Sequence, residues 1–308
     1  MAVKSVQAPA AVVMIRPHHF RVNPETAADN AYQVDTSTMN PQQLSRDAFH
    51  QLSSAAEQLE QVGVKVHVFE DEGADTPDSV FPNNWFSTHS GGHVALYPML
   101  SPARRRERRS DIIEMLKREY RVQDVLDYSG LEPDGLFLEG TGAMVLDHIE
   151  RVAYAVSSLR TNPIAMERFA THFNFEPLAF EASDSNGTPV YHTNVLMCVA
   201  TDFVMIGLSM LKNPQRRYEI ERRFTASGRE IIDLSEEQIA KFAGNAIELQ
   251  GRDGRVLALS TTAREALNDQ QVASIERSAT LLPLHIPTIE MAGGSVRCTL
   301  AGIHLASR

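Results

Sequence analysis

Residues 137–156 read FLEGTGAMVLDHIERVAYAV, with two apolar runs separated by a polar turn at 147–150. Apolar runs rich in strand-forming residues on either side of a short polar turn are typical of a β-hairpin. The pattern recurs around 90–92, 201–202 and 252–254. The turns lie roughly fifty to fifty-seven residues apart, a spacing found in repeat architectures. The sequence therefore predicts four hairpins built from one repeated unit.

Each hairpin is followed by a charged stretch that favours a helix. In the first stretch Ile112, Ile113, Leu116 and Tyr120 recur at helical spacing among arginines and glutamates. The predicted helices cover 102–120, 162–173, 213–223 and 262–266. A further short strand is predicted after the last three, at 177–180, 231–234 and 281–285. Hairpin, helix and strand together make a ββαβ unit.

A fifth unit requires both ends of the chain. The last strand, predicted over 295–305, has no helix after it, whereas the N-terminal part supplies a strand at 11–16, a helix at 42–62 and a strand at 65–70. Joining these segments closes a ring and leaves no exposed sheet edge between the first and last units. Because no Pro/Gly/Ser-rich linker interrupts the chain, we expect a single domain over 1–308. The predicted fold is α/β, a five-bladed propeller of pseudo-fivefold ββαβ modules.

The composition is that of a globular protein and excludes several classes of partner. Of 308 residues, 43% are hydrophobic and 22% charged, and the net charge of -10 has the wrong sign for binding a nucleic-acid backbone. The longest apolar stretch, 191–211, is interrupted by Thr201 and Asp202 and is predicted as two strands rather than a membrane span. The first residues show no secretory signal pattern. We therefore expect a cytoplasmic protein that binds neither nucleic acid nor membrane.

Polar residues recur at one register of the first strand in each predicted module. They are Asn83 and Asn84, Glu139, His192 and Asn194, Asn245, and Cys298. From Asn84 onward the successive members are 51 to 55 residues apart. If the modules are equivalent, these side chains converge on one central cavity although they are distant in sequence.

Cys298 is the predicted nucleophile of this cavity. Two glycines and a serine precede it, whereas Cys198 lies in the apolar run VLMCVA and is expected to be a small buried hydrophobe. A nucleophilic cysteine needs its thiolate form, which a nearby protonated histidine favours, and His192 is the candidate. Strand alternation places His192 and Asn194 on one face. Glu139 interrupts an apolar strand with a charge that is costly to bury unpaired.

Several short motifs resemble those of the pentein superfamily of guanidino-group-modifying enzymes, over nearly the whole chain. The segment at 78–81, Asp-Ser-Val-Phe, resembles one that leads into the substrate carboxylates of these enzymes. Leu138-Glu139-Gly140 is similar to their Glu-Gly-Gly strand, and 158–162 to their Ser-x-Arg-Thr segment. His192-x-Asn194 is similar to their His-x-Asp pair, and Cys298 to their C-terminal nucleophile.

The resemblance implies a propeller fold, no metal or organic cofactor, and covalent catalysis by Cys298 with His192 and Glu139. It also implies that Arg160 holds the α-carboxylate of an amino-acid substrate, since its planar guanidinium suits bidentate hydrogen bonding. Asp78 is expected either to orient the amino-acid end or to cap a turn. Asn83 and Asn84 are expected to bind substrate or to form a structural turn.

Two departures from the superfamily pattern indicate the substrate. Carboxylates that grip a cationic guanidinium in relatives correspond here to the amides Asn84 and Asn194. An amide both donates and accepts hydrogen bonds, so it suits a neutral ureido group better than a guanidinium. The stretch at 81–85, Phe-Pro-Asn-Asn-Trp, also resembles the arginine-deiminase-related citrulline-utilisation hydrolases. The predicted activity is therefore hydrolysis of citrulline to ornithine, ammonia and carbon dioxide.

Other interpretations remain open. An arginine or guanidine deiminase or an amidinotransferase is the enzymatic alternative, and a noncatalytic binding protein of the same fold is the other. The partner is expected to be a small amino acid, and a homo-oligomer is compatible with the sequence. The basic run at 104–109 is interpreted as a solvated helix face. His18, His19, His89 and His93 form no recognisable metal signature.

Overall fold

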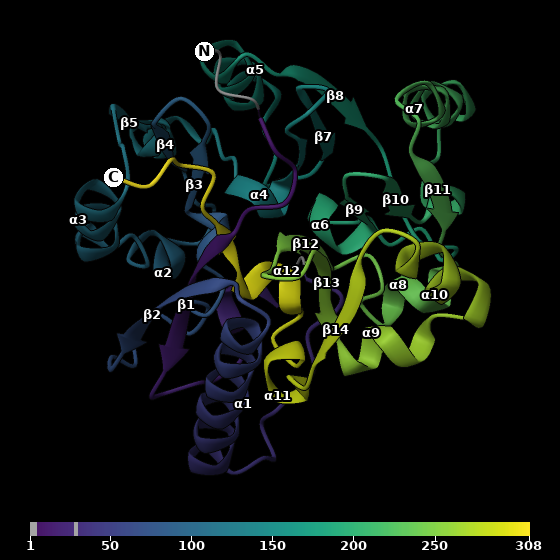
Figure 1. The fold of residues 1–308 in the computed structure, drawn as a ribbon. Coiled ribbons are helices and arrows are strands. Elements are labelled where there is room, and N and C mark those ends of the chain that lie inside the picture. The colour runs from purple at the N-terminus through teal and green to yellow at the C-terminus, as the bar shows by residue number, and fades with distance from the viewer. Residues whose placement is uncertain (1–4, 28–29) are drawn as a thin grey trace.

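The computed structural model describes residues 5–27 and 30–308. Within this part of the chain the strands form five three-stranded sheets. Each sheet contains an antiparallel pair of strands, and its third strand runs parallel to one strand of that pair. Five modules of this kind fit the predicted pseudo-fivefold α/β architecture, and Figure 1 shows their longer helices at the periphery.

The first complete module shows how sequence pattern becomes structure. Strands β3 (Phe86–His89) and β4 (His93–Leu96) pair around the turn at 90–92. Helix α3 (Ser110–Glu119) follows the short α2 (Pro102–Arg105) and buries its apolar face. Strand β5 (Asp124–Asp127) then returns parallel to β4.

The next three modules repeat this order. They consist of β6 (Met144–Asp147), β7 (Val152–Val156), α5 (Pro163–Phe173) and β8 (Glu176–Phe180); β9 (Met197–Val199), β10 (Phe203–Ile206), α7 (Pro214–Ala226) and β11 (Glu230–Asp233); and β12 (Ile247–Gln250), β13 (Arg255–Ser260), α9 (Thr261–Ala266), α10 (Asp269–Glu276) and β14 (Thr280–Leu284). The second strands of these modules are largely buried, and β7 is buried over its whole length. Short helices outside the repeat are η1 (Pro24–Thr26), η3 (Ser129–Asp134), η4 (Leu208–Met210), α8 (Glu236–Ala240) and α11 (Pro287–Glu290).

The fifth module joins the two ends of the chain, as the sequence predicts. Strand β15 (Ala301–Gly302) pairs antiparallel with β1 (Ala11–Pro17), and Val12 faces Gly302. Strand β2 (Lys65–Asp71) runs parallel to β1 on its other side, and α1 (Pro41–Gln61) connects the two. In Figure 1 the purple β1 accordingly lies beside yellow chain from the C-terminal part, although the ends marked N and C are apart.

The prediction of one continuous strand over 295–305 is wrong. This segment forms the one-turn helix α12 (Val296–Thr299) before the two-residue strand β15. Equivalent turns precede three other hairpins: η2 (Pro82–Asn84), α4 (Gly140–Ala143) and α6 (Thr193–Leu196). The recurring polar residues therefore lie on or beside these turns rather than on the strands. A single turn carries too few residues for a helical period to be visible in the sequence.

Helix α10, which was not predicted, has a clear local cause. The side chain of Asn268 accepts a hydrogen bond from the backbone of Gln271, and the Gln271 side chain accepts one from the Asn268 backbone. This capping box begins a helix after the short α9.

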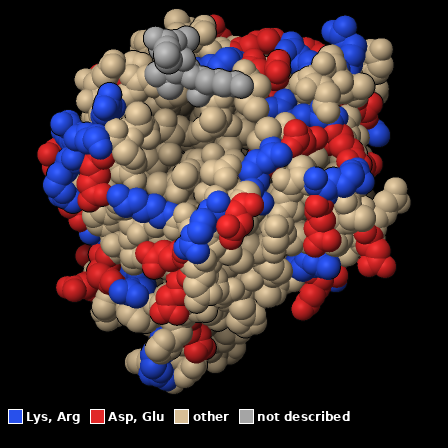
Figure 2. Space-filling model, viewed as in Figure 1, with Lys and Arg blue, Asp and Glu red and all other residues tan. Residues whose placement is uncertain are grey.

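The described helices include none with the length and apolar character needed to cross a bilayer. Figure 2 shows Lys and Arg interspersed with Asp and Glu over the viewed face, around a hollow lined mostly by other residues.

Candidate active site

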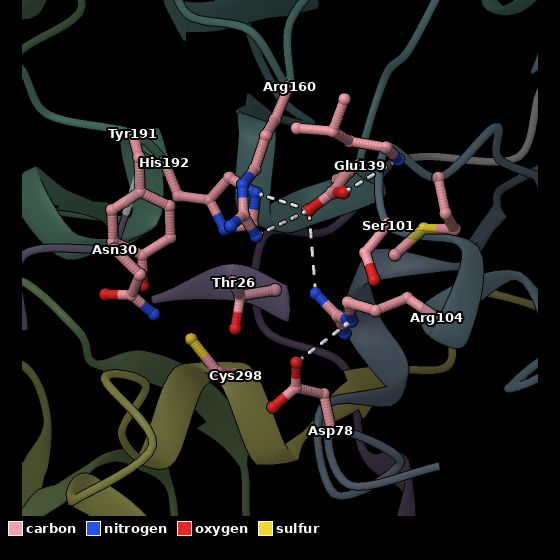
Figure 3. A network of polar contacts seen from close by, with 12 residues as sticks. Thr26, Asn30, Asp78, Ser101, Arg104, Glu139, Arg160, Tyr191, His192 and Cys298 are labelled. Atoms are coloured by element: carbon pink, nitrogen blue, oxygen red, sulfur yellow. Dashed lines mark hydrogen bonds and ion pairs between the residues drawn. The ribbon is translucent and has the colours of Figure 1, made fainter. Parts of the chain in front are cut away.

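The one-turn helices bring distant residues to a small buried cavity of about 20 Å³. Its lining comprises Thr26, Asn30, Asp78, Phe81, Asn84, Arg104, Arg160, Tyr191, His192, Ala292, Gly294 and Cys298. Five predicted site residues are in this set: Asp78, Asn84, Arg160, His192 and Cys298. The volume suffices for about one water molecule, so the cavity is too small for an amino acid in this conformation. Figure 3 shows the polar network at this site.

Cys298 lies on α12 and is almost fully buried. Its sulfur accepts hydrogen bonds from the Nδ2 atoms of Asn194 and Asn245, both at 3.2 Å. Hydrogen bonds to the sulfur favour the thiolate over the thiol. A Cβ atom on Gly294 would lie 2.8 Å from the Phe81 ring and 3.2 Å from the Cβ of Cys298. Glycine is therefore required for α12 to approach the cavity wall this closely.

His192 precedes α6 and donates from Nε2 to Oε2 of Glu139 at 2.9 Å. Burial lowers the pKa of His192 to about 4, although the Glu139 carboxylate opposes this shift. The expectation of a protonated imidazole is therefore wrong for this conformation: the ring is neutral near pH 7, and Nδ1 is free to accept a proton. The expectation that His192 and Asn194 share a strand face is also wrong, because Asn194 lies within α6.

Glu139 is fully buried and connects the histidine to two arginines. Its Oε2 lies 3.2 Å from Nη1 of Arg160 and 3.5 Å from Nη1 of Arg104, and Oε1 accepts from the Leu100 backbone. Burial alone would raise the pKa of Glu139, but the charges of Arg160 and Arg104 and the His192 hydrogen bond lower it below its usual value. The carboxylate therefore stays charged and holds the imidazole in one orientation.

Arg104 corrects the interpretation of the basic run at 104–109. Its side chain is buried on α2, where it pairs with Glu107 at 3.0 Å and approaches Asp78 at 3.6 Å. Burial raises the pKa of Glu107 to about 8 despite this pairing. The sequence suggests a solvated face because Arg104 stands among other arginines, and its partners Asp78 and Glu139 are distant along the chain.

Asp78 and Arg160, which were predicted to bind substrate, both contact other side chains of the protein. Oδ2 of Asp78 accepts from Asn23 at 2.8 Å, whereas its buried Oδ1 has no hydrogen-bond partner among the described residues. The Arg160 guanidinium contacts Glu139 and lies 5.1 Å from the centre of the Tyr191 ring.

The asparagines occupy different layers around the cavity. Asn84 lines it directly, whereas Asn194 and Asn245 lie behind Cys298 and reach its sulfur. The side-chain oxygens of Asn194 and Asn245 and both amide atoms of Asn83 are buried without a hydrogen-bond partner in the described part of the chain. Asn83 does not line the cavity, and only its backbone oxygen contacts α4, by accepting from Thr141.

Three further polar residues of the cavity lining, Tyr191, Thr26 and Asn30, were not predicted. Tyr191 donates to the backbone of Gly293, and its position next to His192 was the available signal. Thr26 and Asn30 come from the N-terminal part of the chain, which carries no matching motif. Cys198 is buried as expected, and burial raises the pKa of its thiol to about 12. Among the residues that the structure describes, no group of three or more His, Cys, Asp or Glu could hold a metal ion.

Comparisons with known proteins identify the family and the fold. The family model of eukaryotic N,N-dimethylarginine dimethylhydrolase matches residues 16–305. No curated protein sequence matches the chain.

Three solved structures illustrate the likeness of the fold. One is the N-terminal domain of ArgZ, an arginine dihydrolase from the ornithine-ammonia cycle in cyanobacteria, as a cysteine-to-serine mutant bound to substrate. Its TM-score is 0.73 and its sequence identity 16%, and the match covers 95% of this chain and 97% of that chain. AgrE in complex with ornithine and NAD+ has a TM-score of 0.74 and 19% identity over 97% of this chain, which spans 40% of the AgrE chain. Dimethylarginine dimethylhydrolase from Pseudomonas aeruginosa, a cysteine-to-serine mutant complexed with citrulline, has a TM-score of 0.65 and 12% identity, with 96% and 99% covered.

Proposed function

The chain belongs to the N,N-dimethylarginine dimethylhydrolase family of the pentein superfamily, and from this premise we propose that it is a cysteine-dependent hydrolase of a ureido amino acid. Citrulline is the substrate that fits best, with ornithine, ammonia and carbon dioxide as products. We further propose that the five modules close into one propeller domain with the site at its hub.

The observation that carries the proposal is the pair of neutral amides on the nucleophile. Asn194 and Asn245 donate to the sulfur of Cys298. Among the described residues that line the cavity, Asp78 is the only carboxylate, and it lies 3.6 Å from the buried Arg104. A guanidinium needs anionic acceptors around its five donors, whereas a ureido group needs both donors and acceptors. A neutral ureido group at the end of the substrate side chain therefore suits this lining better than a positively charged guanidinium.

The first half-reaction uses the neutral histidine. Nδ1 of His192 takes the thiol proton, and the thiolate attacks the ureido carbon to form a C–S bond, with the oxyanion held by nearby N–H donors. The C–N bond to the ornithine amine then breaks, and the amine takes the proton from His192. Glu139 stabilises the transient imidazolium. A carbamoyl group remains on Cys298.

The second half-reaction needs only water. A water molecule in the space left by the amine gives a proton to His192, and its oxygen attacks the carbamoyl carbon. The C–S bond breaks, and the sulfur recovers the proton from His192. The released carbamate decomposes to ammonia and carbon dioxide.

The other cavity residues suit the amino-acid end of the substrate. Arg104 and Arg160 are both buried and positively charged, as an α-carboxylate requires. The unpartnered Oδ1 of Asp78 is available to accept from the α-ammonium group. The cavity must widen to admit any amino acid, because its volume holds about one water molecule.

A guanidine-directed enzyme is the second candidate, as a deiminase, a dihydrolase or an amidinotransferase. Its support is the activity of the structural relative ArgZ, an arginine dihydrolase. In this case Asp78 and Glu139 would meet the cation.

Parallel assays with citrulline and arginine separate the two candidates. We expect ornithine and ammonia from citrulline, with loss of all turnover in Cys298→Ser while citrulline binding is retained. Mass spectrometry after acid quenching should find a carbamoyl adduct on Cys298. Turnover of arginine without turnover of citrulline would overturn the substrate assignment, and full activity of Cys298→Ser would overturn the mechanism.

Asn194→Asp tests the role of the amides. A carboxylate in place of an amide that donates to the sulfur removes a hydrogen bond and repels the attacking thiolate. We expect citrulline kcat/KM to fall about 100-fold or more, which corresponds to about 3 kcal/mol, while the affinity for arginine improves. Unchanged citrulline turnover would show that this amide does not act on the nucleophile.

A further inference from the structure

The side chain of Tyr191 contacts three parts of the candidate active site that are distant from one another in sequence. It lines the cavity, is 7% exposed and directly precedes His192. Its hydroxyl group reaches the segment that leads into α12, and its ring lies near Arg160 and His192. Figure 3 shows Tyr191 beside His192, with Cys298 below them. The proposed reaction gives this side chain no role.

The hydroxyl group of Tyr191 holds the backbone at Gly293. It donates to the carbonyl oxygen of Gly293 at 2.7 Å, in a contact buried from solvent. Burial raises the pKa of Tyr191 well above its usual value, so the hydroxyl group stays protonated and can donate. Gly293 and Gly294 have no side chains by which their neighbours could hold them. The segment can therefore be fixed at these two residues only through its backbone.

The position of this segment sets the position of the nucleophile. Cys298 follows Gly293 by five residues, and α12 begins between them. The two amides that donate to the sulfur of Cys298, Asn194 and Asn245, belong to other modules and do not move with α12. A shift of the segment at Gly293 would lengthen these hydrogen bonds. A displacement of about 1 Å in a reacting group can lower a rate about 100-fold.

The ring of Tyr191 supports a different group, the Arg160 guanidinium. The central carbon of that guanidinium lies 5.1 Å from the centre of the ring. A cation within about 6 Å of an aromatic face is attracted to it, and more strongly where water is excluded. Arg160 is 3% exposed, and Glu139 accepts from its Nη1. The carboxylate thus holds one edge of the guanidinium and the ring supports its orientation.

We propose that Tyr191 is a positioning residue with two separable functions: its hydroxyl group positions Cys298 through Gly293, and its ring positions Arg160 for the α-carboxylate of the substrate. This inference rests on the proposed cysteine-dependent reaction at this site. It applies to citrulline and to arginine alike, because both carry the same α-carboxylate. The first function serves the attack by sulfur and the second serves substrate binding.

Tyr191→Phe and Tyr191→Leu separate the two functions in steady-state kinetics. Tyr191→Phe removes the hydroxyl group and keeps the ring, so we expect kcat to fall about tenfold while KM stays within about twofold of the wild type. Tyr191→Leu also removes the ring, so KM should in addition rise about fivefold or more.

Tyr128→Phe is the matched control. Tyr128 is also 7% exposed, and its hydroxyl group is hydrogen-bonded to His172 at 2.7 Å, but it does not line the cavity. This variant loses a comparable hydrogen bond elsewhere, so we expect the kcat and KM of the wild type. A fall in kcat as large as that of Tyr191→Phe would mean that loss of stability, rather than of positioning, slows the enzyme.

Crystal structures of the wild type and of Tyr191→Phe without substrate provide a measurement that does not depend on turnover. In the variant we expect the sulfur of Cys298 to lie beyond hydrogen-bonding distance of Asn194 or Asn245. An unmoved sulfur or an unchanged kcat in Tyr191→Phe would overturn the role of the hydroxyl group, and an unchanged KM in Tyr191→Leu would overturn the role of the ring. A wild-type protein that turns over neither citrulline nor arginine would contradict the proposed function, whereas the sulfur position would still test the contact through Gly293.

Discussion

His192 determines how the proposed reaction responds to pH. Its pKa in the folded protein is about 4, below the ordinary 6.5, so the neutral ring that accepts the thiol proton persists until the pH falls towards 4. We expect kcat/KM for citrulline to show no acid limb near pH 6.5. The measurement is kcat/KM between pH 5 and 8. An inflection between pH 6 and 7 would contradict a neutral His192.

The free energy of unfolding also depends on the titration of His192, so it must be measured at the same pH values as the activity. Between pH 6.5 and 4 the unfolded state binds a proton at this histidine and the folded state does not, so the free energy of unfolding falls as the pH falls. A shift of this size corresponds to about 3 kcal/mol, fully lost only below pH 4. Urea unfolding at each pH distinguishes loss of activity from loss of the fold.

At the residue scale, the sequence predicts a site residue correctly when that residue stands at the recurring register of the repeat. Cys298, Asn194 and Asn245 share a register, and the structure brings both amides to the sulfur. Arg104 could not be found in this way, because the environment of a charge depends on which distant residues surround it. Only the fold shows that Arg104 contacts Asp78 and Glu139 rather than solvent.

At the scale of elements, the turn α4 sets the distance between Asn84 and His192. A Cβ on Gly142 would lie 2.0 Å from Nδ2 of Asn84 and 2.9 Å from Nδ1 of His192, the atom that accepts the thiol proton. We expect Gly142→Ala to lower kcat about 100-fold or more, because a displacement of about 1 Å has this effect on positioned groups. Steady-state kinetics with citrulline measures the loss.

Gly130→Ala is the matched control for this substitution. Nothing lies within 4 Å of a Cβ at Gly130, so we expect activity and stability close to those of the wild type. Wild-type kcat in Gly142→Ala would show that the histidine and Asn84 are not held against this turn. A variant that loses its near-UV circular dichroism would instead report unfolding.

The one-turn helices also mark the limit of prediction for elements. Hairpins, long helices and third strands follow from periods of 2 and 3.6 residues, which segments such as 137–156 display clearly. In the segment 293–302, by contrast, the glycines, α12 and a two-residue strand follow one another within ten residues. An apolar run interrupted by one polar residue resembles a strand in the sequence, although the chain turns there to direct Cys298 inward.

At the scale of the whole molecule, the pairing of both chain ends in one sheet was predictable, because each end lacks part of a ββαβ unit. The C-terminal part lacked a helix and the N-terminal part lacked a hairpin partner, and the pairing of β15 with β1 satisfies both. The small volume of the cavity at Cys298 was not predictable, because it depends on how tightly the modules pack. Internal volumes of this size reflect packing rather than sequence pattern.

Leu300 tests whether the proposed ring unfolds as one unit. It is fully buried between α12 and β15, and Leu300→Ala should lower the free energy of unfolding by about 2–5 kcal/mol. Trp85, the single tryptophan, is also fully buried and lies far from Leu300 in sequence. In a closed ring the loss at Leu300 lowers the urea midpoint equally for Trp85 fluorescence and far-UV circular dichroism. Leu159→Ala, at a leucine that is 73% exposed, should leave both midpoints unchanged. Separate midpoints for the two probes in Leu300→Ala would mean that the modules unfold independently and that the chain ends do not close the structure.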